Sequence, residues 1–194
     1  MRDDGARSQG PHWRSPALLL RACEIRDIPE ITAIYRQAVL HGTASFEIDP
    51  PDEAEMARRR AALDEAGHPY LVAELGDRVA GYAYAGPYRA RLAYRSTVEN
   101  SVYVAESARR TGIARNLLSR LIDESAARGF RQMIAVIGDS ANLASIRLHE
   151  VAGFSHTGVL RSVGWKHGRW LDTVLMQRSL GTGDQMPSEL GQPA

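Results

Sequence analysis

The sequence predicts an α/β domain in which helices flank a mixed central β-sheet. Segments rich in β-branched and aromatic residues alternate with segments whose apolar residues recur every three or four positions. Their order along the chain is β-α-α-β-β-β-α-β-α-β-β. A strand, a helix and a second strand between Val98 and Ile137 predict a right-handed crossover, while close strand pairs elsewhere predict antiparallel neighbours.

The length of 194 residues allows one domain with a substantial core. We place this single domain at residues 17–180. The segments 1–16 and 181–194 are rich in Gly, Ser and Pro and lack periodicity. We therefore interpret them as flexible N-terminal and C-terminal tails.

The composition is that of an ordinary globular protein. Lys and Arg total 24 and Asp and Glu total 23, so the net charge of +1 provides no general field for nucleic acid. No segment approaches the roughly 20 apolar residues that span a bilayer, and the N-terminus does not resemble a secretion signal. The single cysteine, Cys23, fits a reducing compartment, and we interpret it as a small strand residue and not a nucleophile. We expect a cytoplasmic protein that binds neither nucleic acid nor membranes.

The first third of the domain reads as a strand followed by two helices. Residues 18–25 form the strand, and Asp27 with Glu30 has the spacing of a capping box at the start of a helix. Five apolar residues share one face of that helix: Ile28, Ile31, Ile34, Tyr35 and Ala38. A loop at 42–51 then precedes a charged helix at 52–66.

The remainder alternates strands and helices. Residues 69–88 read as a hairpin and 97–105 as the next strand. A helical stripe follows and ends at Gly129; its members are Ile113, Leu117, Leu118, Leu121, Ile122 and Ala126. A strand at 131–138 and a helix at 142–153 lead to the final segment, 154–180, which reads as two long strands around a turn at Lys166–Gly168.

The stretch VYVAESARRTGIARNLL contains a candidate anion site. The first amides of a helix are unpaired and carry the positive end of the helix dipole. Gly112 and Ala114 leave those amides accessible, and Arg109 and Arg110 add charge. An ordinary solvated helix entry is the alternative, but arginines at a helix start oppose the dipole unless an anion is present.

This stretch resembles the coenzyme A signature of the GNAT superfamily of N-acetyltransferases. Arg109-x-x-Gly112-x-Ala114 follows a strand that ends at Val104, and NLASIRLHEVAGF resembles the helix whose asparagine contacts the cofactor. The resemblance implies the GNAT fold and acetyl-CoA as cosubstrate, with no metal. It implies cofactor contacts from Val102, Tyr103, Val104, Arg109, Arg110, Thr111, Gly112, Ile113, Ala114, Arg115, Asn142 and Ser145.

Further motifs resemble the phosphinothricin and methionine sulfoximine acetyltransferases. They are TASFE, AGYAYAGPYRARLAY, TVENSVYV, RLHEVAGF and VGWKHGRWLD, in this order. The resemblance implies acetylation of the α-amine of a small amino acid analogue. Ser145 stands near the position where the wider superfamily often has a tyrosine, so no tyrosine general acid is implied there.

Glu99 and His149 are the candidate catalytic residues. An amine must lose its proton before it attacks a thioester, and Glu99 can accept that proton directly or through water. Strand parity places Ser101 and Tyr103 on the same side as Glu99. A surface carboxylate is the alternative for Glu99, and a structural or exposed histidine for His149. The resemblance favours a general base and a second proton-handling group.

The candidate acceptor contacts lie in three motifs. Arg91 can pair with a carboxylate or phosphinate through two hydrogen bonds, and Tyr94 offers a hydroxyl donor. The strand around Asn100 and Ser101 offers further contacts. Phe46 is either a wall of the acceptor pocket or a core aromatic, and a solvated loop arginine is the alternative for Arg91.

The partners we expect are a small-molecule amine and a second copy of the chain. Trp165 and Trp170 flank the last turn and are interpreted as packing or dimer contacts, and the six histidines lack metal-ligand spacing. Two other functions remain alternatives: acetylation of a protein or peptide, and non-catalytic binding of coenzyme A. A Rossmann domain is disfavoured because RRTGIA contains one glycine.

Overall fold

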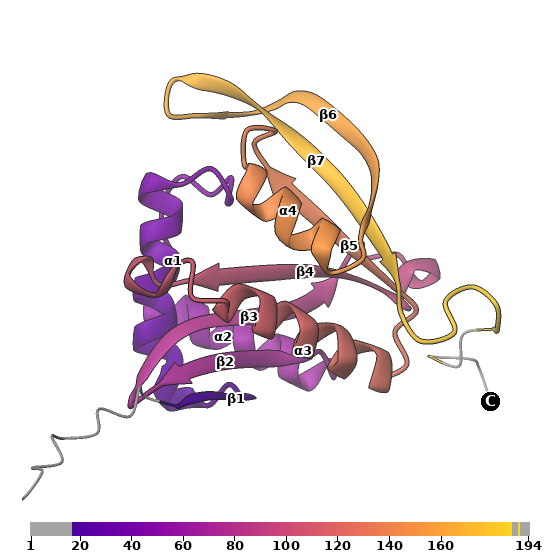
Figure 1. Cartoon of the computed structure of the whole chain (residues 1–194), viewed down its shortest axis with the longest axis horizontal. Helices are drawn as coiled ribbons and strands as arrows, with labels where there is room; N and C mark the ends of the chain where they lie inside the picture. Colours follow the sequence, from indigo (N-terminus) through magenta and orange to yellow (C-terminus); the bar gives the residue numbers. More distant parts are fainter. Residues whose placement is uncertain (1–16, 188–189, 191–194) are drawn as a thin grey trace, which may run out of the picture.

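A seven-stranded sheet in the order β1-β2-β3-β4-β5-β7-β6 forms the centre of the computed structural model, which describes residues 17–187 and 190 (Figure 1). The strands are β1 Leu18–Ala22, β2 Tyr70–Leu75, β3 Arg78–Pro87, β4 Thr97–Val104, β5 Gln132–Gly138, β6 Ser155–Lys166 and β7 Arg169–Ser179. The β4–β5 pair is parallel and the other neighbours are antiparallel. The mixed sheet and the element order are therefore confirmed.

Four helices cover the two faces of this sheet (Figure 1). They are α1 Ile28–His41, α2 Glu53–Glu65, α3 Ile113–Ala127 and α4 Leu143–Val151. Apolar residues of α1 and α2 form one buried cluster with Tyr70 and Val72 of β2. Leu71 and Ala73 of the same strand join the other cluster, which contains the buried stripe of α3. Because neighbouring strand residues point to opposite faces, the two clusters lie on opposite sides of the sheet.

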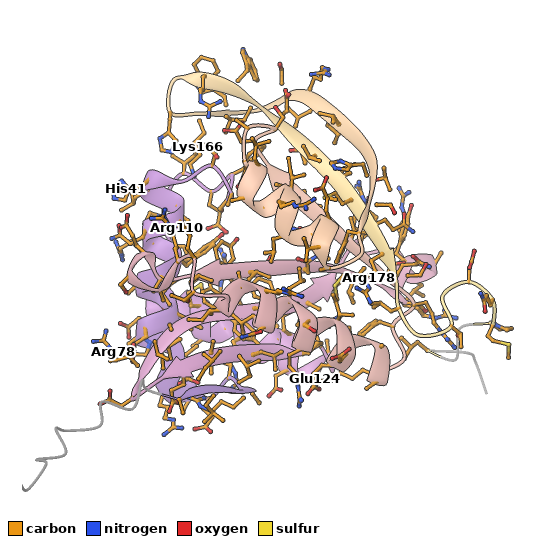
Figure 2. The ribbon with its side chains drawn as sticks, viewed as in Figure 1. His41, Arg78, Arg110, Glu124, Lys166 and Arg178 are labelled. Carbon is orange, nitrogen blue, oxygen red and sulfur yellow. The ribbon has the colours of Figure 1, made fainter. Side chains whose placement is uncertain are left out.

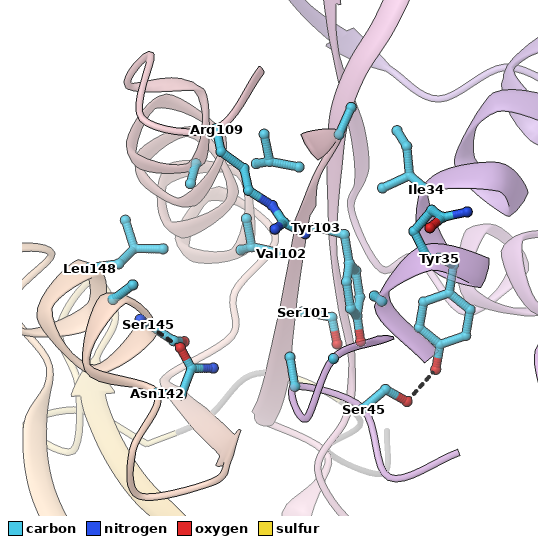
Figure 3. A pocket seen from close by; sticks show the side chains of 18 of the residues that line it. Ile34, Tyr35, Ser45, Ser101, Val102, Tyr103, Arg109, Asn142, Ser145 and Leu148 are labelled. Carbon is cyan, nitrogen blue, oxygen red and sulfur yellow. Dashed lines mark hydrogen bonds between the residues drawn. The ribbon is translucent and has the colours of Figure 1, made fainter. Parts of the chain in front are cut away.

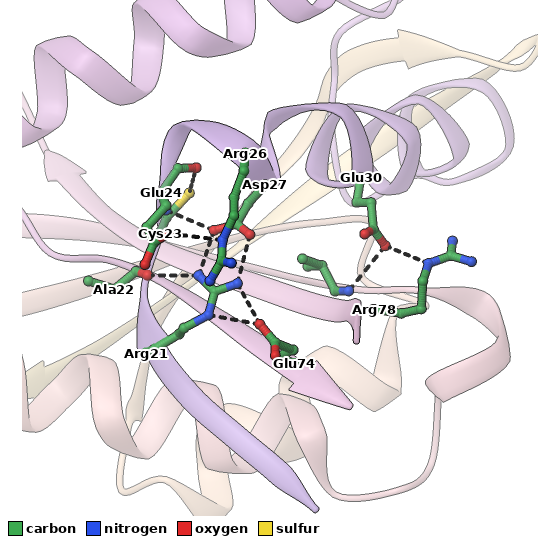
Figure 4. A network of polar contacts seen from close by, with 10 residues as sticks. Arg21, Ala22, Cys23, Glu24, Arg26, Asp27, Glu30, Glu74 and Arg78 are labelled. Atoms are coloured by element: carbon green, nitrogen blue, oxygen red, sulfur yellow. Dashed lines mark hydrogen bonds and ion pairs between the residues drawn. The ribbon is translucent and has the colours of Figure 1, made fainter. Parts of the chain in front are cut away.

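The start of α1 differs from the sequence prediction. β1 ends at Ala22, and the Asp27 side chain does not cap α1. Its carboxylate accepts hydrogen bonds from the Arg21 guanidinium and from the backbone N–H of Glu24 (Figure 4). Glu30 instead accepts from Arg78 Nε at 2.9 Å, so the predicted capping box is wrong. The carboxylate of Asp27 is thus bound by Arg21 of β1 and does not accept from the first N–H groups of α1.

The other helix boundaries agree with the sequence. Asp52 caps α2 by accepting from the Glu55 N–H at 2.8 Å. The predicted stripe of α3 is buried along most of its length, and the chain leaves that helix through Gly129 with φ of +86°. Cys23 lies one residue beyond β1 and not within the strand as predicted. It is buried, and desolvation raises the pKa of its thiol to about 12, which agrees with its interpretation as a residue that is not a nucleophile.

The last two strands form a long hairpin around a turn at His167 and Gly168. Trp165 and Trp170 face each other across it, with ring centroids 5.2 Å apart, and remain 55% and 61% exposed. The two rings therefore contact each other outside the core.

The chain after β7 contacts the domain. Arg131 donates to the carbonyl oxygen of Pro187 at 3.3 Å and to the Thr182 hydroxyl, and Leu190 packs against the core cluster of α3. Residues 188–189, 191–194 and the predicted N-terminal tail at 1–16 lie outside the described residues. None of the described helices is long and apolar enough to cross a membrane.

Candidate active site

The site opens where β4 and β5 separate. These parallel strands pair only from Thr97 with Gln132 to Asn100 with Ala135. Beyond that point β4 is paired with β3 alone, while β5 is paired with β7. A cavity of about 1670 Å³ runs along the gap and is lined by α1, α3, α4 and both strands. Pockets for one small ligand measure roughly 300–1,000 Å³, so this cavity has room for a large cosubstrate and an acceptor.

The free edge of β4 presents backbone donors to the cavity. The N–H of Ala105 donates to the Ala80 carbonyl of β3. Successive N–H groups of a strand point to opposite sides, so the N–H groups of Val104 and Val102 point toward the gap. Val102 and Val104 line the cavity. An extended ligand in the gap can therefore pair with this edge as a further strand would.

The start of α3 has an open turn at the place where the sequence predicts an anion cradle. Arg110 and Gly112 adopt positive φ of 63° and 87°, which turns the chain sharply into the helix. A Cβ on Gly112 would meet no protein atom within 4 Å, so the space above the first amides is open. Arg109, Arg110 and Arg115 line the cavity here, and the first turn contains no acidic residue. This geometry suits a pyrophosphate group.

The opposite wall belongs to α4. The Asn142 side chain caps this helix by accepting from the Ser145 N–H at 3.2 Å, and both residues line the cavity (Figure 3). His149 lies one turn further, buried, with Nδ1 2.8 Å from the Ser145 carbonyl oxygen and Nε2 3.0 Å from Asn100 Oδ1. Burial lowers the pKa of this histidine, and the bond to the Ser145 carbonyl acts in the other direction.

Glu99 lines the cavity on the other face of β4. Asn100 contacts α4, so its neighbour Glu99 points toward the side of α1 and α2. Tyr84 lies beside it and shares a hydrogen bond with Ser101, and desolvation raises the pKa of its hydroxyl. Desolvation also raises the pKa of Glu99, while the nearby charge of Arg89 partly lowers it. A half-buried carboxylate with a raised pKa is suited to accept a proton near neutral pH.

The loop between α1 and α2 closes this side of the cavity. Ser45 is held through its hydroxyl by Tyr35 at 2.9 Å and through its carbonyl oxygen by Lys166 Nζ at 2.7 Å. Figure 2 shows Lys166 near the tip of the β6–β7 hairpin, beside this loop. Phe46 follows in the loop and lines the cavity, packed over Gly138 and Gly164. The hairpin therefore positions the loop.

Comparison with known proteins decides the family. Residues 29–154 match the acetyltransferase (GNAT) family. The chain belongs to this family. It is an acetyl-CoA-dependent N-acetyltransferase with the GNAT fold, as the sequence resemblance implies.

Two curated relatives and one solved structure illustrate what this acetyltransferase is similar to. It is 54% identical to phosphinothricin N-acetyltransferase of Alcaligenes faecalis, over 84% of this chain and 85% of the relative. It is 42% identical to L-methionine sulfoximine/L-methionine sulfone acetyltransferase of Salmonella typhimurium, over 84% and 95%. A solved phosphinothricin acetyltransferase from Sinorhizobium meliloti, in complex with AcCoA, superposes with a TM-score of 0.87 at 47% identity, covering 90% of this chain and 94% of that one.

The structure brings most of the predicted residues of the acetyltransferase to one cavity. The lining includes Phe46, Glu99, Asn100, Ser101, Val102, Tyr103, Val104, Arg109, Arg110, Gly112, Ile113, Ala114, Arg115, Asn142, Ser145 and His149. Thr111 is outside the lining, and its hydroxyl donates to the Ala108 carbonyl at 2.6 Å. Arg91 and Tyr94 are exposed and also outside it, with Tyr94 against the Tyr88 ring. Their role as acceptor contacts stays a prediction.

Several residues of the acetyltransferase site were missed by sequence reasoning. Tyr84 pairs with Ser101 across β3 and β4, and the hairpin register could have indicated this position. Tyr35 and Lys166 reach the site through tertiary contacts for which the sequence carries no local signal. In the part of the chain that the structure describes, no group of three or more His, Cys, Asp or Glu side chains is placed to hold a metal ion.

Proposed function

We propose that this enzyme acetylates the α-amine of a small amino acid analogue of the phosphinothricin or methionine sulfoximine type, with Glu99 as general base. The relatives at 54% and 42% identity are named for these acceptors. The observation that carries the proposal is the position of Glu99. It lies in the same cavity as the anion cradle, on the face of β4 opposite α4.

In this reaction each wall of the cavity contacts a different part of the cosubstrate or the acceptor. Acetyl-CoA supplies the acetyl group as a thioester. The first turn of α3 and its arginines bind the pyrophosphate, and the Val102 and Val104 amides hold the chain that leads to the acetyl group. The Val104 N–H is the candidate donor to the thioester carbonyl, where such a donor contributes about 3 kcal/mol to transition-state stabilisation.

Glu99 acts on the acceptor. A free α-amine is mostly protonated near neutral pH, and its nitrogen has no lone pair for attack. Glu99 accepts one amine proton, directly or through water, and the freed lone pair forms the C–N bond as the C–S bond breaks and sulfur keeps the electron pair. The new amide nitrogen then loses a second proton, and the thiolate takes up a proton, which gives the neutral amide and free coenzyme A. The raised pKa of Glu99 brings its basicity closer to that of the amine and favours this transfer.

A thiol-release assay tests the acceptor class. We expect turnover with phosphinothricin and with methionine sulfoximine, and none above background with a lysine-containing peptide or an aminoglycoside. Equal rates with the peptide would support a protein acetyltransferase instead. If no acceptor gives thiol release, despite tight acetyl-CoA binding, the result would support the non-catalytic alternative.

Three further expectations belong to this proposal. The enzyme works in the cytoplasm, forms a homodimer, and uses Arg91 and Tyr94 to contact the acidic groups of the acceptor. Sedimentation equilibrium tests the dimer. Arg91→Lys tests the acceptor contact: because that contact exists before and during reaction, the Michaelis constant should rise more than turnover falls.

A further inference from the structure

His149 lies where α4, β4 and β5 meet, and both its ring nitrogens face oxygen atoms. Nδ1 is 2.8 Å from the Ser145 carbonyl oxygen, and Nε2 is 3.0 Å from Asn100 Oδ1. The ring is held edge-on against Phe154, with centroids 5.0 Å apart, and His149 is only 4% exposed. The protein therefore holds the ring through both nitrogens and through the edge contact with Phe154, and His149 also lines the cavity.

The amide of Asn100 cannot simply be turned over. Its Nδ2 donates to the Ile134 carbonyl oxygen of β5 at 3.1 Å. A flipped amide would place Oδ1 against that carbonyl, two acceptors with no proton between them. Asn100 is also the last residue of β4 that pairs with β5. Its side chain thus joins β5 to α4 at the point where the two strands separate.

This arrangement has a consequence for the charge of the ring. A neutral imidazole carries one N–H and can donate to only one of the two oxygens, whereas an imidazolium donates to both. His149 also lies in the last turn of α4, where the helix dipole favours a cation. Burial acts in the opposite direction and lowers the pKa. The Ser145 carbonyl opposes the effect of burial, and an acceptor oxygen at Nε2 favours the doubly protonated ring in the same way.

No described acid is paired with the ring. The charged residues on α4, β4 and β7 and directly after β5 are Glu99, Asp139, Arg147, Glu150, Arg169, Asp172 and Arg178. Glu99 points to the opposite face of β4. The Glu150 carboxylate contacts Arg147, and the Asp139 carboxylate contacts Arg169. Asp172 accepts from the Ser162 N–H, and Arg178 donates to the Ala152 carbonyl. The groups that face the two ring nitrogens are therefore the Ser145 carbonyl and the neutral Asn100 amide.

We propose that Asn100 is a positioning residue that keeps His149 doubly protonated to a higher pH than its burial alone would allow. Because both N–H groups are donated to the protein, His149 acts as a fixed positive charge in the cavity wall and not as a mobile proton donor. On the proposed function, this charge stabilises the anion that develops on the departing sulfur. The sequence-based role of His149 as a proton-handling group is refined accordingly.

NMR titration of the ¹⁵N-labelled histidine rings, without acetyl-CoA, tests the inference. His149→Gln assigns the resonance, and the exposed His156 serves as internal reference. In the wild type we expect both His149 nitrogens to carry a proton at pH 6. Asn100→Leu should lower the pKa by about one unit or more and leave a neutral ring protonated at Nδ1, and Asn100→Asp should raise it by a similar amount.

The outcomes separate this inference from the proposed function. A wild-type ring with a single protonated nitrogen at pH 6, or a pKa that is equal in Asn100→Leu and Asn100→Asp, would overturn it. If Asn100→Leu does not fold, the wild type and Asn100→Asp still decide. The titration needs no acceptor, so a failed acceptor assignment leaves it intact. In the active enzyme, the alkaline limb of the turnover profile should move to lower pH in Asn100→Leu.

Discussion

The ring of Phe46 occupies the space in which a side chain on Gly164 would stand. A Cβ built on Gly164 lies 2.3 Å from Cε2 of Phe46, and one on Gly138 lies 2.9 Å from Cε1 and 2.2 Å from the Thr43 carbonyl oxygen. Gly138 of β5 and Gly164 of β6 therefore allow the loop after α1 to lie close against the sheet. The position of Phe46 in the cavity wall depends on the absence of two side chains.

Gly164→Ala should displace Phe46 and weaken acceptor binding. A contact at 2.3 Å cannot be kept, so the ring must move. We expect the Michaelis constant for the acceptor to rise about tenfold, equivalent to about 1.4 kcal/mol, with acetyl-CoA affinity unchanged. Gly158→Ala is the matched control on the same strand, because a Cβ there meets nothing within 4 Å. Identical acceptor constants in both variants would contradict the role of Phe46.

Glu99→Gln should lower turnover by about 10²-fold or more at neutral pH, because the amide cannot accept the amine proton. The base is active when ionised, so wild-type turnover should rise as pH passes upward through the raised pKa of Glu99. The deficit of the variant should shrink at alkaline pH, where the amine is already neutral. Steady-state rates across the pH range check this, with the exposed Glu65→Gln as control. Wild-type turnover in Glu99→Gln at every pH would exclude a general base.

Gly112→Ala should weaken acetyl-CoA binding by at least about tenfold, and Gly112→Val more strongly, because a side chain would stand over the first amides of α3. Positive φ also costs stability, roughly 1–2 kcal/mol for a residue with a Cβ. Gly67→Ala separates the two effects: Gly67 has φ of +74° and open space around it, but lies outside the cavity lining. Calorimetry should show weaker binding only for the Gly112 variants. An unchanged affinity would remove this turn from the cofactor site.

Asp27→Asn should destabilise the fold by about 3 kcal/mol at pH 7, because it removes the charge of a carboxylate that is 3% exposed and paired with Arg21. Burial favours the neutral form of Asp27, but the hydrogen bonds from Arg21 and Glu24 outweigh it, and the pKa is lowered. The stabilisation is therefore present above the unfolded-state pKa of about 3.9 and is lost as pH falls through the lower folded-state value.

Urea unfolding of Asp27→Asn and wild type at several pH values measures this. The difference between them should be full at pH 7 and shrink below about pH 4. The exposed Asp123→Asn is the control. A difference that does not depend on pH would mean that packing, and not charge, accounts for the role of Asp27.

Local patterns predicted much of the fold, including the helix that begins after Gly112. The stripe of α3 and the glycine after it depend on residues a few positions apart, and the structure confirms both. Strand parity correctly placed Ser101 and Tyr103 on the same face of β4 as Glu99, since alternation is a property of the extended backbone itself. The capping-box spacing, by contrast, gave a wrong prediction at Asp27. Arg21 forms ion pairs with Asp27 and with Glu74 of β2, and these contacts replace the predicted helix cap.

The sequence by itself determined the order of elements, the family and the start of α3 after Gly112, because each rests on periodicity or on a short motif whose conformation is local. Only the tertiary structure decided which side chains meet: Lys166 with the Ser45 carbonyl, Phe46 with Gly164, and Asn100 with His149. These partners are far apart along the chain. Their contact depends on how the hairpin, the loop and α4 pack against the sheet, and on which buried polar atoms then remain to be paired.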